Sequence, residues 1–306
     1  MQKQYNYYYN NNIELLDQNI GTYGENLSIA ILTCNKSELT INLLKSINEY
    51  LRDFKGEIVL LDNNSDNIEK EILKKYLKKY PLKYKIYYSK KNLGIAGGRK
   101  KAFSLANNDW ILSLDNDMYF VENPIEDINL CIDKLGARFI NLSAFNADKD
   151  KRFINGGKFK ISKKDFTYVT ADTFDETIND RIYLSTFVFG GSSVINKYAY
   201  NLIGGYDENF FVGYEDVDFS IRCYKAGIKI ANINLCCVVH NHQMMDTNSA
   251  KKYEKIRYDY DRIMNSSAYF YKKYNKKYSV LSKGEKEFLK NSLKQVKNDN
   301  WIYKKN

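Results

Sequence analysis

From residue 27 onward, short apolar runs alternate with segments in which apolar residues recur every three or four positions. Short apolar runs of this kind are typical of buried strands in a parallel sheet. They cover residues 27–33, 57–62, 85–88 and 110–114. The segments between them have the spacing of amphipathic helices, as at Leu43, Leu44, Ile47 and Leu51. This alternation predicts an α/β fold, with a mostly parallel sheet and helices on both faces.

The pattern divides the chain into three regions. Residues 1–26 are rich in Tyr and Asn, and we expect a poorly packed N-terminal extension there. Residues 27–245 carry the strand and helix pattern, with a further strand near residues 138–145. Residues 246–306 are basic and aromatic, and their apolar spacing predicts two or three helices.

Asp66 and Glu69 stand just before the second predicted helix. An Asp followed three residues later by a Glu, ahead of a helical apolar pattern, predicts a capping box. In that motif each side chain accepts a hydrogen bond from the backbone N–H of the other residue. We therefore expect the helix to begin at Asp66.

Polar side chains follow each of the four predicted strands. Ligands of parallel sheets bind at the carboxyl ends of the strands, so these positions predict a binding site. The residues concerned are Thr33 and Asn35, then the segment from Asp62 to Ser65, then Asn92, Gly94 and Arg99, and finally Asp115, Asn116 and Asp117.

Asp115 and Asp117 lie two residues apart at the end of the fourth strand. Carboxylate oxygens are the ligands that Mg²⁺ and Mn²⁺ prefer, and diphosphate oxygens can complete the coordination. A metal held there would stabilise negative charge on a departing diphosphate. The alternative interpretation is a solvated polar turn.

A second acidic group, Glu215, Asp216 and Asp218, stands at the head of a predicted helix. One of these carboxylates could act as a general base toward an attacking hydroxyl. The alternative is a first helical turn whose acidic residues complement the helix dipole. The two His residues, His240 and His242, follow on a predicted strand, and an imidazole there is a candidate metal ligand.

The net charge of +10 is confined to the C-terminal region. Residues 251–306 hold 16 Lys and Arg against 6 Asp and Glu, so the rest of the chain has 31 basic and 31 acidic residues. The excess indicates either a solvated helical face or a surface attracted to anionic lipid or an anionic acceptor. No nucleic-acid-binding motif accompanies it, and we expect no nucleic-acid partner.

Five Cys residues without a CxxC pair indicate a reducing compartment, and Cys34 and Cys223 fall in apolar surroundings. No secretory signal pattern and no apolar run of about 20 residues is present. We therefore expect a cytoplasmic protein, either free or peripheral on the inner face of the membrane.

Together, five motifs resemble those of glycosyltransferase family 2, an inverting family with the Rossmann-like GT-A fold. The resemblance covers residues 27–245 and is strongest over Gly204–Arg222, which reads GGYDENFFVGYEDVDFSIR. His240 follows Asp216 by 24 residues, a spacing similar to that in bacterial rhamnosyl- and galactosyl-type members. The other motifs are Thr33-Cys-Asn35, Leu61-Asp-Asn-Asn-Ser-Asp66, Asn92-Leu-Gly-Ile-Ala-Gly-Gly-Arg99 and Leu114-Asp-Asn-Asp117.

The resemblance implies a role for each matching residue. Asp216 would be the general base, Glu215 would position donor or acceptor hydroxyls, and Gly190 and Gly191 would let the backbone approach the sugar. Mn²⁺ or Mg²⁺ would be the cofactor, with Asp117, His240 and Asp115 as ligands. The donor nucleotide would be bound by Thr33, Asn35, Asp62, Asn92, Gly94, Arg99, Asp115 and Asn116.

The implied activity is transfer of a sugar from a nucleotide sugar, such as a UDP- or dTDP-sugar, to a saccharide, lipid-linked or peptide acceptor. Surface polysaccharide or glycoconjugate assembly in a bacterium is the usual setting of such enzymes. Lys100 stands where the family usually has Asn, and Asn63 where many members have a second Asp, so the identity of the nucleotide stays open.

Two other functions compete with this interpretation. A sugar-nucleotide-forming nucleotidyltransferase would need a Gly-rich, basic loop after the first strand, whereas residues 34–38 read CNKSE. A non-catalytic nucleotide-sugar-binding protein would not need the candidate base or the metal ligands, and Asp117, Asp216 and His240 are all present.

Overall fold

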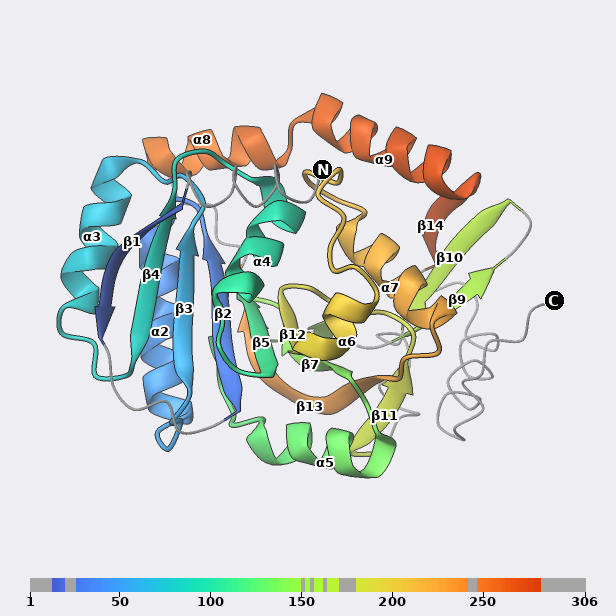
Figure 1. Cartoon of the computed structure of the whole chain (residues 1–306), viewed down its shortest axis with the longest axis horizontal. Coiled ribbons are helices and arrows are strands. Elements are labelled where there is room, and N and C mark those ends of the chain that lie inside the picture. The colour runs from blue at the N-terminus through green and yellow to red at the C-terminus, as the bar shows by residue number, and fades with distance from the viewer. Residues whose placement is uncertain are drawn as a thin grey trace.

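The computed structural model describes residues 13–19, 26–149, 152–154, 157–161, 164–170, 180–241 and 247–281. Its main feature is a mixed sheet of 11 described strands in the order β1-β4-β3-β2-β5-β12-β7-β13-β11, with β6 and β8 at its side (Figure 1). Helices cover both faces of this sheet. The predicted α/β fold is confirmed.

The four strands β4, β3, β2 and β5 are parallel to one another, because strand–helix–strand units build this part of the sheet. The four predicted strands are present, with ends that differ from the sequence pattern by one residue at most. They are β2 (Leu27–Thr33), β3 (Glu57–Asp62), β4 (Tyr84–Ser89) and β5 (Trp110–Asp115). The helices that connect them are α2 (Ser37–Tyr50), α3 (Asn67–Leu77) and α4 (Gly94–Leu105).

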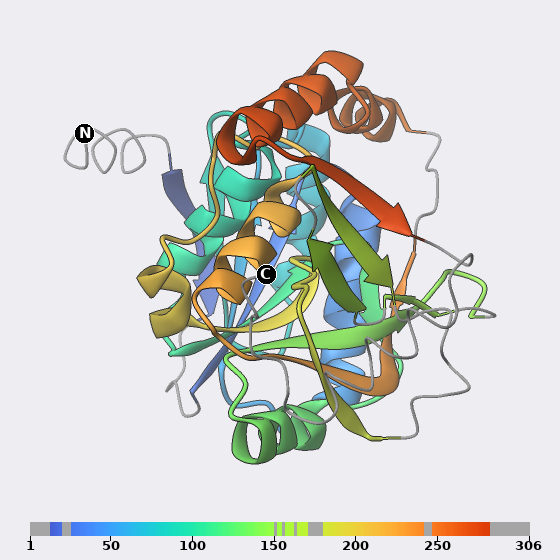
Figure 2. The same ribbon diagram turned by 90° about the vertical axis from the view of Figure 1, so that its right-hand side faces the viewer.

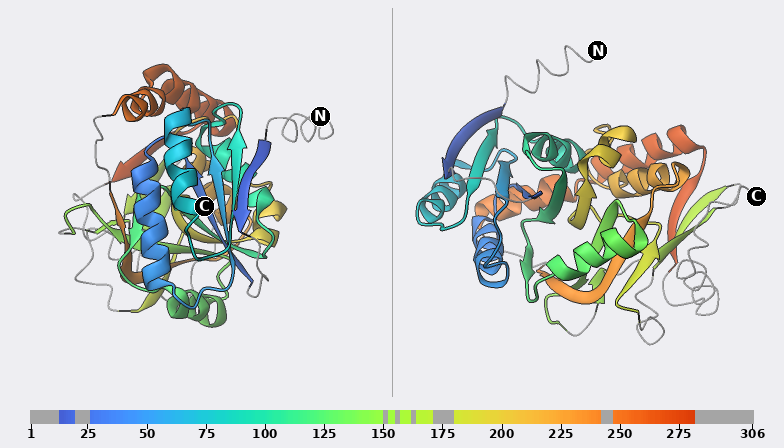
Figure 3. Two further views of the ribbon diagram at one scale, coloured as in Figure 1. Left: turned by 90° about the vertical axis from the view of Figure 1, so that its left-hand side faces the viewer. Right: turned by 60° about the horizontal axis from the view of Figure 1, so that its bottom comes forward.

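Two apolar clusters fill the spaces between the sheet and the helices. On one face, α2 and α3 lie side by side and bury Leu43, Leu44 and Leu73 (Figure 3). On the other face, α4 buries Phe103 against Tyr200 and Tyr206, in a cluster that also contains Phe219. The helices packed on these faces also include α5 (Ile125–Leu135), α6 (Lys197–Leu202) and α7 (Glu215–Lys225).

The second half of the sheet is mixed and brings distant segments together. β12 (Ser192–Asn196) runs antiparallel to both β5 and β7 (Phe139–Phe145), whereas β13 (Ile230–His240) is parallel to β7. The end of β13 pairs with β6 (Met118–Phe120), so that His240 lies opposite Met118. The remaining strands are β8 (Arg152–Ile154) beside β7 and β11 (Ile182–Ser185) beside β13.

Two expectations from the sequence are wrong. Ile13–Asn19, expected to be poorly packed, forms β1 and pairs antiparallel with β4 at the edge of the sheet. Asp66 precedes α3, but its side chain makes no capping hydrogen bond and instead pairs with Lys252. Glu69 accepts hydrogen bonds from the backbone N–H and hydroxyl of Ser37, because α2 lies close enough to compete for its carboxylate.

The C-terminal region forms α8 (Asn248–Arg257), α9 (Tyr260–Tyr274) and β14 (Lys277–Leu281). Both helices run along the upper edge of the molecule in Figure 1. Figure 2 shows β14 beside β10 (Asp165–Thr170), which also pairs with β9 (Gly157–Ile161) in a second small sheet. Among the described residues, no helix is long and apolar enough to cross a membrane.

A buried ionic network joins α9 to α7. Asp218 is fully buried and accepts hydrogen bonds from Arg222, one turn later on the same helix, and from the Tyr274 hydroxyl at 2.7 Å. Lys273 forms ion pairs with Asp218 and with Asp207. Asp218 is therefore committed to holding the two helices together.

Candidate active site

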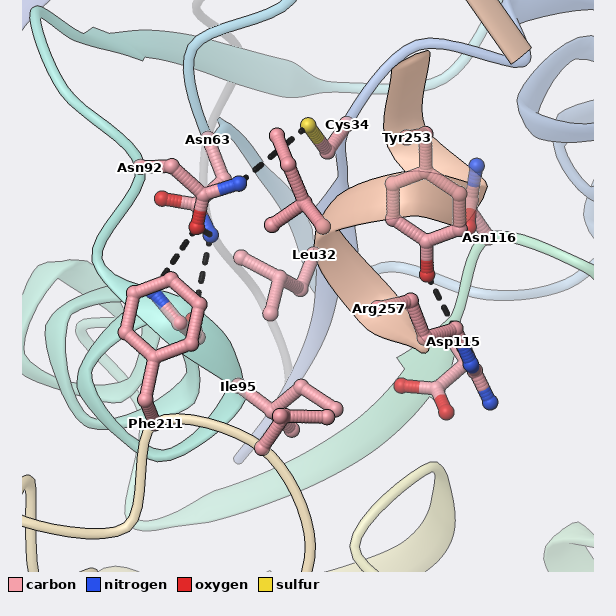
Figure 4. Close-up of a pocket in the computed structure, with 13 residues that line it drawn as sticks. Leu32, Cys34, Asn63, Asn92, Ile95, Asp115, Asn116, Phe211, Tyr253 and Arg257 are labelled. Carbon is pink, nitrogen blue, oxygen red and sulfur yellow. Dashed lines mark hydrogen bonds between the residues drawn. The ribbon is translucent and has the colours of Figure 1, made fainter. Parts of the chain in front are cut away.

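The carboxyl ends of β2, β3 and β5 meet at one pocket, as the position of their polar residues predicts (Figure 4). The strand ends and the start of α4 supply Leu32, Cys34, Asn63, Asn92, Gly94, Ile95, Asp115 and Asn116. Later segments close the pocket with Phe211, Val212, Tyr253, Ile256 and Arg257. The pocket is therefore a joint product of the parallel sheet, the loop before α7 and helix α8.

Asn63 organises one wall of this pocket. Its side-chain oxygen accepts the backbone N–H of Leu93 at 2.8 Å, and its amide donates to Asn92 and to the Gly94 carbonyl. Gly94 has a φ of +72°, and a Cβ there would lie 2.4 Å from the carbonyl oxygen of Phe211. Only glycine combines this backbone conformation with that close approach.

Three predicted nucleotide-binding residues, Asp62, Thr33 and Asn35, lie behind the pocket wall or support it. Asp62 is 1% exposed and its carboxylate accepts the backbone N–H of Ser65, so it shapes the loop after β3. Burial raises the pKa of this carboxyl group. Thr33 and Thr40 share a hydrogen bond, and the amide of Asn116 donates to both. Asn35 is buried, and its side chain accepts from the backbone N–H of Asp66.

Arg99 lies at the centre of a cluster of three carboxylates. Its Nη2 atom is 2.9 and 3.1 Å from the two carboxylate oxygens of Asp115. Its Nη1 atom is 3.1 Å from Asp216 and 3.5 Å from Glu215. The guanidinium is buried, and one cation therefore balances three acidic groups drawn from β5 and from the start of α7.

Gly190 and Gly191 fit closely around this cluster. A Cβ at Gly190 would lie 2.3 Å from Arg99 Nη1, and one at Gly191 would lie 2.2 Å from Asp115 Oδ2. The backbone N–H of Gly190 also donates to Asp216 at 3.1 Å. Any side chain at these positions would displace the charged groups.

The environment disfavours the ionised forms of the acidic pair at the start of α7. Burial, followed by the charge of Asp216, raises the pKa of Glu215 to about 7, although Arg99 opposes this shift. Burial also raises the pKa of Asp216, against the influence of Arg99 and of the Gly190 N–H. A carboxylate with a raised pKa is a better proton acceptor than an ordinary one, which suits a general base.

Asp117 and His240 form the second polar group of the site. Both are buried, and His240 Nε2 lies 3.3 Å from Asp117 Oδ1. The pairing of β6 with β13 brings them together, and the backbone N–H of Asn241 donates to the Asp117 carbonyl. Across the described parts of the chain, no three His, Cys, Asp or Glu side chains form a ready metal cluster. The carboxylate of Asp115 is directed to Arg99 instead.

Several lining residues were not among the predicted site residues, including Phe211, Tyr253, Ile256 and Arg257. Tyr206, also not predicted, lies at the carboxylate cluster, since a Cβ on Gly190 would be 2.5 Å from its hydroxyl. Tyr206 belongs to the GGYDE segment that resembles the family motif, so the sequence offers a reason to consider it as a site residue. Tyr253 and Arg257 stand one helical turn apart in a region without a motif.

The sequence model described as Glycosyl transferase family 2 matches residues 28–204. No curated protein sequence matches the chain.

Solved structures of similar fold include three transferases. GalNAc-T7, solved with UDP, GalNAc and Mn²⁺, superposes with a TM-score of 0.59 at 17% identity and covers 84% of this chain. TarS 1-349 of S. aureus, solved with UDP-GlcNAc, superposes with a TM-score of 0.53 at 19% identity and covers 74% of this chain. The mannosyltransferase PcManGT of Pyrobaculum calidifontis, solved with GDP-Man and Mn²⁺, superposes with a TM-score of 0.51 at 14% identity and covers 76% of this chain. The chain spans 56%, 61% and 62% of those three chains, respectively.

The carboxylate cluster makes the stability of an Arg99→Met variant depend on pH. Without the cation, the carboxylates bind protons more tightly in the folded than in the unfolded chain, so stability falls as pH rises. We expect the free energy of unfolding to be lower than in the wild type by roughly 3–5 kcal/mol near pH 8, and by less near pH 5. Urea unfolding at both pH values measures this difference.

The matched control is Lys45→Met, which removes an exposed cation from α2 and should change stability little at either pH. An Arg99→Met deficit that is the same at pH 5 and pH 8 would show that the guanidinium does not balance the three carboxylates.

Proposed function

Because the chain belongs to glycosyl transferase family 2 and has the GT-A fold, we propose that it transfers a sugar from a nucleoside diphosphate sugar to an acceptor hydroxyl. The observation that carries the proposal is the strand-end pocket, which is lined by Asp115 of the Arg99 carboxylate cluster and by Phe211 and Val212 of the loop before α7. UDP or dTDP is the proposed nucleotide, since similar folds have been solved with UDP and UDP-GlcNAc. Saccharide, lipid-linked and peptide hydroxyls remain the acceptor classes, with polysaccharide or glycoconjugate assembly as the setting.

Asp216 is the proposed general base, and the reaction inverts the anomeric centre. The side chain of Asp216 is 23% exposed, whereas that of Glu215 is only 7% exposed, so an acceptor reaches Asp216 more readily. The acceptor hydroxyl gives its proton to Asp216 and attacks the anomeric carbon. The bond from that carbon to the diphosphate oxygen breaks on the opposite side, and its electrons leave with the diphosphate. Glu215 positions the hydroxyls that surround the reaction.

The pair of Asp117 and His240 fits a divalent cation. A carboxylate oxygen and an imidazole nitrogen suit Mn²⁺, and the two side chains face each other in a buried position. These two residues would hold the metal, with diphosphate oxygens of the donor as further ligands. When bound, Mn²⁺ or Mg²⁺ would supply positive charge that stabilises the departing diphosphate.

The outer face of α9 supports peripheral binding to anionic lipid. Tyr260, Met264 and Tyr271 lie on one side of α9 and are 46–73% exposed, and Lys272, next to Tyr271 in the sequence, is exposed as well. Exposed aromatic and basic side chains on one surface suit the headgroup region of a membrane. This surface would hold the enzyme near a lipid-linked acceptor.

The base is tested with Asp216→Asn, which keeps the size of the side chain and removes the proton acceptor. Transfer from the preferred donor should fall by about 10²- to 10⁴-fold, while donor affinity stays within a few fold of the wild type. A radiolabelled sugar-transfer assay and calorimetry measure the two quantities. Transfer near the wild-type rate would assign the base to Glu215, because Asp218 is committed to Arg222, Lys273 and Tyr274.

The metal ligands are tested by nucleotide binding in the presence of Mn²⁺. Asp117→Ala and His240→Ala should weaken Mn²⁺-dependent binding of UDP or dTDP by at least about tenfold, because each removes one ligand. Asp133→Ala, which removes an exposed carboxylate from α5, is the control and should bind as the wild type does. Turnover that persists in EDTA would contradict the metal requirement.

Membrane contact is tested by co-sedimentation with vesicles that contain anionic lipid. Tyr260→Ser, Tyr271→Ser and Lys272→Gln, combined, should abolish binding that is present in the wild type at low salt and that weakens as salt rises. The control combines Tyr198→Ser and Leu202→Ser, which are equally exposed on α6. A wild-type protein that stays in the supernatant at low salt would rule out the membrane surface.

A further inference from the structure

Helix α8 is attached to the loops that follow β2 and β3. The side-chain amide of Asn35 donates to the Ser249 carbonyl at 2.7 Å, and Lys36 forms an ion pair with Glu254. On the neighbouring loop, Asp66 pairs with Lys252 at 2.6 Å. These contacts fix the position of α8 across the pocket.

The inward face of α8 directs two polar side chains into the pocket. Tyr253 and Arg257 stand one turn apart, and an Nη1 hydrogen of Arg257 is donated to the Tyr253 hydroxyl at 2.8 Å (Figure 4). Asp115 lines the same pocket. Tyr253 is the one hydrogen-bond partner of the Arg257 guanidinium among the described residues, so further N–H donors of this group can bind a ligand.

The charges around the pocket single out Arg257. Among the residues that line the pocket, Arg257 is the one cationic side chain and Asp115 the one anionic side chain. The other guanidinium nearby, Arg99, is already engaged by three carboxylates. Burial alone would lower the pKa of Arg257, but Tyr253 and then the charges of Asp115 and Asp117 raise it. Arg257 is thus a positive charge in the same pocket as Asp115, and Asp117 follows Asp115 by two residues.

We propose that Arg257 binds the diphosphate of the donor and stabilises it as the leaving group, with Tyr253 holding the guanidinium in place. This inference rests on the proposed function for the class of donor. An Arg side chain presents parallel N–H groups that match phosphate oxygens. When the bond from the anomeric carbon to the diphosphate breaks, its electron pair remains on the diphosphate oxygen. The guanidinium keeps its proton and balances the added negative charge.

The experiment compares nucleotides with and without phosphates on the full chain. Binding of UDP, dTDP and GDP in the presence of Mn²⁺ is measured by calorimetry, and binding of the matching nucleosides by ligand-observed NMR. Arg257→Met should weaken nucleoside diphosphate binding by about 10- to 100-fold, the size of a lost charged hydrogen bond, and leave nucleoside binding unchanged. Arg257→Lys should recover part of the loss.

Lys255→Met is the matched control, since it removes an exposed cation two residues away on the same helix and should not alter either affinity. Unchanged diphosphate binding in Arg257→Met would overturn the inference, as would an equal loss of nucleoside and diphosphate binding, which indicates a distorted pocket. A wild-type chain that binds none of the three diphosphates would contradict the proposed donor class itself. Diphosphate binding that survives in both variants would leave that class intact and remove only the role of Arg257.

Discussion

The candidate site depends on one buried guanidinium. Arg99 is placed by α4, yet its partners come from the end of β5 and the start of α7, more than a hundred residues apart. Three carboxylates gathered without a cation would repel one another and protonate instead of remaining charged. Arg99 therefore lets Asp115, Glu215 and Asp216 share one small volume. Positions 190 and 191 are occupied by glycine for a steric reason, because the backbone passes so close to the cluster that no side chain fits there.

The antiparallel pairing of β6 with β13 has a comparable role on the other side of Asp115. Asp117 lies in the turn after β5, and the chain continues directly into β6, which pairs with the last residues of β13. That register places His240 at Asp117, although 122 residues separate them in the sequence. The acidic cluster and the carboxylate–imidazole pair thus lie next to each other, at Asp115 and Asp117.

Much of the fold could be predicted from the sequence, because β2, β3 and β5 are largely buried and read as nearly continuous apolar runs. β2, β3 and β5 were located for this reason, and their polar ends correctly indicated where the pocket lies. β1 escaped prediction because an edge strand needs little apolar surface, and IELLDQN has no clear alternation. The capping box failed because Ser37 and Lys252, from other elements, compete for the same carboxylates.

Residue roles were less predictable than residue positions, because a side chain near a strand end can face the ligand or the protein. Asp62 carries the expected charge but turns inward to its own loop, and Asn63 beside it lines the pocket. The same division applies to the basic C-terminal region. Lys, Arg and aromatic residues are interleaved along it, yet their side chains have different partners. Lys273 and Tyr274 bind Asp218, and Arg257 lines the pocket. Tyr260 and Tyr271 are exposed to solvent. Its composition indicates only that the region is basic, whereas the helical phase of α8 and α9 determines which charges face the pocket, the rest of the fold or the solvent.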